Sequence, residues 1–196
     1  MKKSRKNSGF TLIEMMCALL ILVFITIGIS FSVNAGSKIY EDSMFESESA
    51  TLAGILNTAL GDILRYSIGS RELTPVEIQA NGNDVGIANI TDSSKRYVFT
   101  SLDYGIQDAY FIIPPHQDGG NMGPVQLKNL RNANVVELIN TGAYPNLVVS
   151  NFQIVFSPRV APGIEGGYYQ ISYKITSTTN PDKVRNVETI VRVMND

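Results

Sequence analysis

The chain opens with an uncharged apolar run and then changes to two other hydrophobic periodicities. No charged residue occurs from Met15 to Val33, which matches the roughly 20 apolar residues that a membrane-spanning helix needs. Four cations precede the run: Lys2, Lys3, Arg5 and Lys6. Positive charge at this position favours retention of the N-terminus in the cytoplasm. The pattern predicts a helix from Phe10 to about Ser32 that crosses a membrane once.

Residues 37–68 continue with the spacing of an amphipathic helix. Apolar side chains recur every three or four positions, at Leu52, Ile55, Leu56, Ala59, Ile63 and Tyr66, with Leu60 and Leu64 widening the stripe. The opposite face is polar, with Glu48, Thr51, Asn57, Thr58, Asp62 and Arg65. A helix with an apolar stripe and a polar back is suited to packing on a sheet. We expect it to continue the first helix and to end at Ile68-Gly69-Ser70.

The C-terminal sixty residues change to a period of two. Apolar and polar side chains alternate in three segments: 152–156, 169–175 and 187–193. This alternation predicts an antiparallel meander with one solvated face, its apolar face covering the helix. It also places Tyr169 and Tyr173 in the core and Tyr168 on the outer face.

Shorter strands are expected between the helix and the meander, at 76–79, 86–90, 96–100, 108–113 and 135–139. Residues 114–134 are rich in Gly and Asn, and we expect them to form one long loop. The predicted fold class is therefore α+β. A long N-terminal helix, membrane-spanning in its first half and amphipathic in its second, packs on an antiparallel β-sheet.

Glu14 is the one acid at the edge of the apolar run. An ionisable side chain is costly in lipid, so its presence points to a function and to a charged partner. The nearest cation in the sequence, Lys6, lies outside the predicted span. A free α-amino group would be a better partner, and a cut just before Phe10 would create one.

The segment Gly9-Phe10-Thr11-Leu12-Ile13-Glu14 resembles the type III signal of type IV pilins and of the pseudopilins of type II secretion and competence systems. The resemblance covers residues 2 to about 33, and beyond residue 70 it rests on architecture alone. It implies that prepilin peptidase cuts after Gly9 and N-methylates Phe10. It also implies that Glu14 neutralises the N-terminal amine of a neighbouring subunit inside a filament.

The resemblance divides the chain into a leader (1–9), a transmembrane and filament-core helix (10–36) and a globular pilin head (37–196). The implied function is that of a structural subunit, a minor pilin, of a type IV pilus-like filament. Its implied partners are prepilin peptidase, other pilin subunits, the assembly machinery and the membrane. The implied location is the cytoplasmic membrane, crossed once with the head outside, and then the extracellular filament.

Cys17 is the only cysteine, so no intramolecular disulfide can form. Many pilins of diderm bacteria carry such a disulfide near the C-terminus. The departure favours a pilin of a Gram-positive cell surface or a pseudopilin. We interpret Cys17 as a small apolar residue that faces lipid or neighbouring helices.

Two other functions stay open. The first is a pseudopilin of a type II secretion or competence DNA-uptake system. The second is a membrane-anchored or secreted binding domain, an adhesin, whose front is an ordinary signal with a cut site at Val33-Asn34-Ala35. That signal would need an apolar run of about 7–15 residues, shorter than the one present, and would leave Glu14 unexplained.

The sequence gives little support for catalysis. It has no Gly-x-Ser-x-Gly, P-loop or His/Cys metal spacing, and we expect the lone His116 to be solvated in a loop. Asn81-Gly82-Asn83-Asp84 and Asp118 are the residues that could contact calcium, as loops in some pseudopilins do. Neither matches an EF-hand, and turn formation explains these residues as well. We expect no other cofactor.

Charge argues against nucleic acid as a partner. The whole chain has a net charge of −2. Removing residues 1–9 takes away four of the sixteen Lys and Arg and leaves twelve against eighteen Asp and Glu, a net charge near −6. Nucleic-acid binding needs clustered cations on one face, so none is expected.

Overall fold

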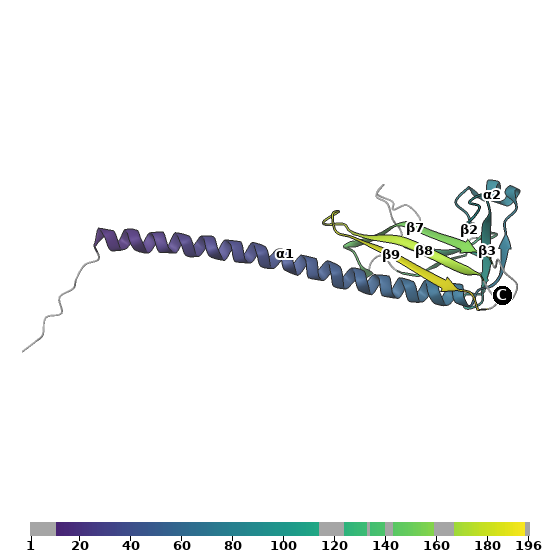
Figure 1. Cartoon of the computed structure of the whole chain (residues 1–196), viewed down its shortest axis with the longest axis horizontal. Helices are drawn as coiled ribbons and strands as arrows, with labels where there is room; N and C mark the ends of the chain where they lie inside the picture. The colour runs from purple at the N-terminus through teal and green to yellow at the C-terminus, as the bar shows by residue number, and fades with distance from the viewer. Residues whose placement is uncertain (1–10, 114–123, 133, 140–142, 159–166, 195–196) are drawn as a thin grey trace, which may run out of the picture. The chain divides into compact units, whose positions relative to one another are not determined.

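A computed structural model describes residues 11–113, 124–132, 134–139, 143–158 and 167–194. The chain divides into two compact units, Met1–Glu46 and Ser47–Asp196. Each unit is described by itself, and the division into leader, span and head stays a prediction. The described part of the first unit is helix, and the second unit contains the end of that helix and the whole sheet (Figure 1).

Helix α1 spans Leu12–Arg65 and covers both predicted helical segments, 10–32 and 37–68, except at their outer ends. It ends at Arg65 instead of Ile68, because the following residues form strand β1 (Ile68–Glu72). The predicted stripe is confirmed at its centre, since Leu56, Leu60 and Leu64 are completely buried.

The edges of that stripe were predicted wrongly. Ile55 is 44% exposed and Tyr66 is 45% exposed, whereas Ala53 is buried. Successive side chains of a helix are about 100° apart around its axis, so Ile55 points in a different direction from the buried Leu56. The apolar stripe is therefore wider than the part of the helix surface that the sheet covers.

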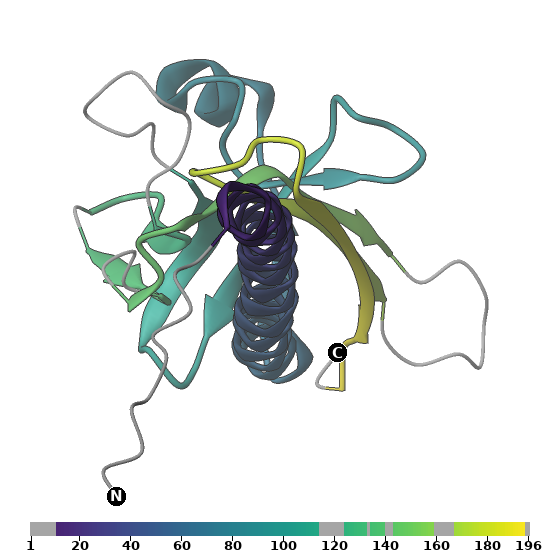
Figure 2. The same cartoon turned by 90° about the vertical axis from the view of Figure 1, so that its left-hand side faces the viewer.

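The described residues contribute nine strands to one sheet and one short helix beside it. After β1 come α2 (Pro75–Asn81), β2 (Ile87–Asn89), β3 (Arg96–Ser101), β4 (Ile106–Ile112), β5 (Gln126–Asn129), β6 (Val135–Glu137), β7 (Leu147–Ser157), β8 (Tyr168–Ser177) and β9 (Val184–Arg192). The strand order is β6-β5-β4-β3-β2-β7-β8-β9, and β1 also pairs with β3. Seen along α1, the sheet curls around the part of the helix that belongs to the second unit (Figure 2).

The predicted C-terminal meander is confirmed. Strands β7, β8 and β9 pair antiparallel in chain order. Tyr169 and Tyr173 are buried, and Tyr168 is 38% exposed, as the alternation predicts. One pairing departs from the expected antiparallel sheet, since β2 runs parallel to β7, with Ala88 opposite Val155.

Tyr173 fixes this meander on the helix. Its hydroxyl lies 3.0 Å from Oδ1 of Asn57 and 3.3 Å from the carbonyl oxygen of Ala53, and donates to these acceptors. The buried phenol therefore has partners, which removes the cost of burying a polar group. Burial raises the pKa of Tyr173, so it stays a neutral donor.

At two glycines there is no room for a side chain. A Cβ at Gly86 would lie 2.9 Å from the carbonyl oxygen of Tyr97, and its φ of +75° is unfavourable for other residues. At Gly167 a Cβ would lie 2.6 Å from the carbonyl oxygen of Ser157 and 2.6 Å from the ring of Phe156. These glycines allow β2 and β8 to start close to their neighbours.

The strand predicted at Val76–Gln79 is wrong, because these residues belong to helix α2. Thr74 precedes the helix, and its side chain accepts a hydrogen bond from the Glu77 amide. The Glu77 carboxylate accepts a bond of 2.9 Å from the Thr74 amide. This reciprocal capping box, with Pro75 in the first turn, is a sequence signal for a helix start. The strand was predicted because the short apolar pattern of this segment also fits a strand.

The long loop predicted at residues 114–134 is also wrong in extent. Strand β5 lies within it and pairs with β4, with Leu127 opposite Phe111. Leu127 is completely buried. The expected strands at 86–90, 96–100, 108–113 and 135–139 are confirmed as β2, β3, β4 and β6, with boundaries shifted by up to two residues.

An ion-pair network joins α2 to two parts of the sheet. Arg71 on β1 donates to both Glu77 oxygens at 3.1 Å and also to Asp108 on β4. Arg131 adds a second ion pair to Asp108 at 3.0 Å. The Arg71 hydrogen bonds, followed by those of Thr74, lower the pKa of Glu77 to about 2.

This network predicts an acid-sensitive contribution from Glu77. The unfolded-state pKa of a Glu is about 4.3, so the contribution is complete above that pH and is lost as pH falls towards about 2. We expect Glu77→Gln to lower the melting temperature at pH 7 and to converge with the wild type near pH 2. Glutamine still completes a capping box. In an Arg71→Gln background the same change should have a smaller pH-dependent effect; an undiminished one would contradict the assignment to Arg71.

Candidate functional site: the capped start of an apolar helix

Thr11 and Glu14 form a closed hydrogen-bonded pair at the start of α1. The amide and the hydroxyl of Thr11 both donate to the same Glu14 oxygen, Oε2, at 2.9 Å. The Glu14 amide lies 3.4 Å from the Thr11 hydroxyl and donates to it. Thr11 is thus the N-cap and Glu14 the third helical residue of a capping box, which satisfies amides that have no partner within the helix.

Glu14 therefore has a second role, as a helix-capping residue, which its charge alone did not predict. The signal was present, because Thr11-Leu12-Ile13-Glu14 has the spacing of a capping box before an apolar run. Glu14 lies at the surface of the isolated chain, and Oε1 makes no hydrogen bond within the described residues. One oxygen therefore holds the helix start while the other is available to a further cation.

The predicted cleavage and methylation residues, Gly9 and Phe10, lie outside the described residues, as does the whole predicted leader 1–9. The structure begins at Thr11, one residue after Phe10. Gly9, Phe10 and the pairing role of Glu14 therefore stay predictions.

From Met15 to Val33 the surface of α1 is apolar and uncovered. By length and composition the helix can cross a membrane, a test that a signal sequence near the N-terminus would also pass. Its large side chains lie at the surface, for example Leu22 (61% exposed), Phe24 (66%) and Phe31 (73%). Such a surface needs lipid or other helices around it.

The hydroxyl groups in this apolar surface are satisfied within the helix. Thr26 donates to the carbonyl oxygen of Leu22 at 2.8 Å, Ser30 to that of Thr26 at 2.9 Å, and Ser32 to that of Gly28 at 2.9 Å. No hydroxyl of these three needs water, so they add little cost in an apolar environment. Cys17 lies exposed on the same surface with a free thiol.

The other candidate residues were in the head. His116 and Asp118 lie outside the described residues. Asn81 ends α2, and Gly82, Asn83 and Asp84 follow it in the turn before β2. Among the described residues no group of three or more His, Cys, Asp or Glu side chains could hold a metal ion, so calcium gains no support from this turn.

Comparison with known proteins identifies the front of the chain. Residues 4–30 match the family model described as the prokaryotic N-terminal methylation motif, the signature of type IV pilins and pseudopilins. Residues 4–30 thus carry the N-terminal signature of type IV pilin and pseudopilin precursors, and the chain has the α+β layout of a pilin-like fold. The motif implies processing by prepilin peptidase and assembly with other pilins. No match was found among curated proteins or among solved structures.

Proposed function

We propose that the chain is a structural subunit, a minor pilin, of a type IV pilus-like filament. In this proposal prepilin peptidase cuts after Gly9, the new N-terminus of Phe10 is methylated, and the subunit enters the filament through α1. Before assembly it crosses the cytoplasmic membrane once, with the head outside. The supporting observation is the methylation motif on an uncovered apolar helix with one acid in its first turn.

The mechanism is exchange of lipid contacts for helix contacts. Lipid and helix surfaces are about equally apolar, so the exchange gains little hydrophobic energy. A charged pair between Glu14 and the Phe10 amine of a neighbour would then select the register of the added subunit. Oε1 of Glu14, which has no hydrogen bond within the described residues, supports this role, because a neighbour can be bound without opening the Thr11 cap.

A pseudopilin of a secretion or DNA-uptake system would use the same helix chemistry. The minor-pilin assignment is supported by the groove at the fork of the sheet, which suits a filament subunit with an additional binding role at the surface. Loss of surface pili on gene deletion would support the minor pilin, and loss of protein secretion or DNA uptake alone would support the pseudopilin. We also infer that the chain is not an enzyme, which a hydrolytic activity surviving purification would contradict.

Intact mass and N-terminal sequencing of the protein from its own cells test the proposal. We expect a mature chain that starts at N-methylated Phe10. A chain starting at Gly36 would mean that ordinary signal peptidase had cut it after Ala35. The filament proposal would then be wrong, and the anchored or secreted adhesin would take its place.

A further inference from the structure

The sheet of the head forks at β3. Tyr97 pairs with Glu72 of β1 and also with Ile87 of β2, so β1 and β2 lie on opposite edges of β3. The pairings of β1 and β4 overlap along β3 in the same way. Strands β2 and β4 therefore share one edge of β3, one after the other. From this fork one wing continues through β2 to β7–β9 and the other through β4 to β6.

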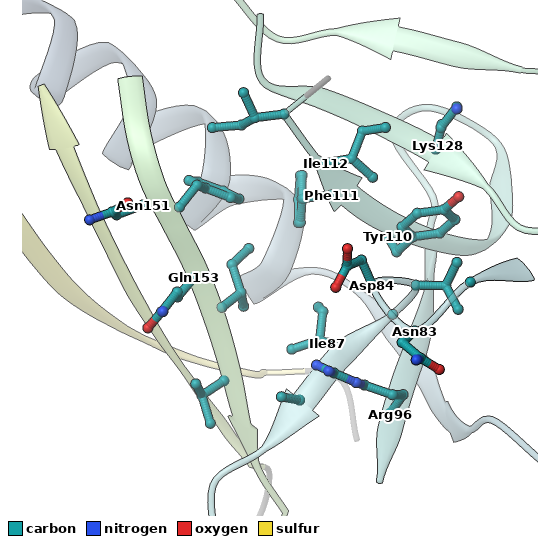
Figure 3. A pocket seen from close by; sticks show the side chains of 18 of the residues that line it. Asn83, Asp84, Ile87, Arg96, Tyr110, Phe111, Ile112, Lys128, Asn151 and Gln153 are labelled. Carbon is teal, nitrogen blue, oxygen red and sulfur yellow. The ribbon is translucent and has the colours of Figure 1, made fainter. Parts of the chain in front are cut away.

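A groove of about 1140 Å³ occupies the fork. Its floor contains buried apolar side chains, including Ile87, Phe111 and Ile154. Phe111 contacts Phe152 of the opposite wing, with ring centroids 6.5 Å apart. Polar residues border the groove: Asn151 and Gln153 on β7, whose side chains point away from the opening, and Asp84 and Tyr110 on the opposite wall (Figure 3).

Each wall of the groove is a strand edge that has no neighbouring strand among the described residues. Strand β2 pairs with β7 only at Val155 and Phe156, so β7 from Leu147 to Gln153 has no strand beside it on that edge among the described residues. On the other wall, β4 pairs with β3 only as far as Ala109, so that no strand of the described part of the chain lies beside Tyr110–Ile112 on the side of β3. A strand edge presents peptide N–H and C=O groups that another extended chain can bind.

A β-bulge shapes the longer edge where it lines the groove. The register between β7 and β8 shifts between Ser150 and Gln153, and Asn151 has a φ of +48°. Non-glycine residues adopt this conformation rarely, and bulges re-aim side chains near binding sites. The result is that both Asn151 and Gln153 have exposed side chains on the groove rim.

The charges in the groove favour an acidic occupant. Arg96 and Lys128 are half-buried in its wall, and neither has an ion pair with any described residue. The single acid of the lining, Asp84, is exposed on the rim. Half-buried cations gain more from a carboxylate than exposed ones do, because water screens the pair less.

We propose that this groove binds an extended acidic peptide segment of a partner protein, which adds as a strand along β7 from Leu147 to Gln153. Main-chain hydrogen bonds to this edge supply the affinity. Arg96 and Lys128 select carboxylate side chains. The inference does not depend on filament assembly, since it concerns the unassembled chain.

Fluorescence anisotropy with labelled peptides tests it, using the full chain in non-ionic detergent. The probe is Thr-Val-Glu-Val-Glu-Val-Thr, capped at both ends, with counterparts that carry Gln or Lys in place of Glu. We expect the Glu peptide to bind, the Gln peptide to bind roughly tenfold more weakly, and the Lys peptide more weakly still. Two further peptides carry N-methyl groups on the odd-numbered or on the even-numbered nitrogens. Only one of the two should lose binding, because only one set of amides faces β7.

Variants locate the site. Arg96→Gln and Lys128→Gln should each remove most of the preference for Glu over Gln, at an unchanged melting temperature. Lys174→Gln, which removes an exposed cation from β8 outside the groove, should leave the preference intact. Absence of binding, equal binding of the Glu and Gln peptides, or tolerance of both N-methylation registers would overturn the proposal.

Two further outcomes would assign the groove to another occupant. Residues 114–123 follow β4 in the chain. If the peptide binds only after these residues are replaced by a Gly/Ser linker, the chain fills its own groove. If light scattering shows self-association that Arg96→Gln abolishes, a second copy is the occupant. Either result would overturn a partner peptide.

Discussion

Replacing Glu14 by glutamine is expected to lower incorporation into the filament at least about tenfold, while the precursor is still made and cleaved. Glutamine at the third helical position completes a capping box as glutamate does, so the bonds to Thr11 are retained. Only the negative charge is lost. The neighbour's N-terminal amine would then enter an apolar helix bundle without a counter-charge, which is costly.

Two variants separate the charge from the cap. Thr11→Val removes the side chain that caps the helix but leaves the carboxylate, and we expect it to assemble much better than Glu14→Gln. Glu41→Gln removes an exposed acid further along α1 and should assemble normally. Quantitative blotting of sheared filaments against whole cells measures all three. Assembly of Glu14→Gln at the wild-type level would contradict the charge-pair mechanism and leave Glu14 a capping residue only.

Truncating Leu60 to alanine is expected to lower the free energy of unfolding of the head by about 2–5 kcal/mol. Leu60 is completely buried, between the equally buried Leu56 and Leu64 on the face of α1 that packs on the sheet. Removing its side chain forfeits the transfer free energy and leaves a cavity in a densely packed core. A loss of this size is a large part of the stability of most domains.

Ile55→Ala is the matched control. Ile55 belongs to the same predicted apolar stripe but is 44% exposed, so its truncation should cost less than about 1 kcal/mol. Denaturant unfolding of the full chain in detergent, followed by near-ultraviolet circular dichroism, measures both. Equal losses for the two variants would mean that the helix is covered over a wider sector than this packing implies.

Local periodicity was enough to predict the helix and the meander. In each of these elements, one face is buried along the whole length of the periodic segment. The pattern shows this face in the sequence, as leucines every four residues from Leu52 to Leu64 and as alternation from Tyr169 to Ile175. What periodicity could not report is how far around the helix the sheet extends, since that depends on distant strands. Ile55 and Tyr66 were misplaced for this reason.

The fork of the sheet could not be predicted from local pattern. Strand β2 has three residues, and its partner residues Tyr97 and Val155 belong to strands that are far apart in the chain. Strand β5 was hidden in a segment rich in Asn and Gly because only Leu127 of its four residues is fully buried. Pairing between distant segments decided both cases, and such pairing overrides weak local propensity.

For the N-terminal site, the sequence was more informative than the fold. The single acid at the edge of the apolar run predicted a functional role for Glu14, and the motif match includes this residue. The cap formed with Thr11 was readable from its spacing but was overlooked. Gly9 and Phe10 depend on the family resemblance, because no local physical rule distinguishes a peptidase site.

The bond from Tyr173 to Asn57 joins residues that are 116 positions apart in the chain, and this fixes when the head can fold. Strand β8 contributes the buried residues Tyr169, Ile171, Tyr173 and Ile175, so a chain still lacking its C-terminal hairpin cannot complete the core. Contacts this distant in sequence form late and slowly. In the proposed topology, the head would therefore cross the membrane as an open chain and become compact only after its last strands had crossed.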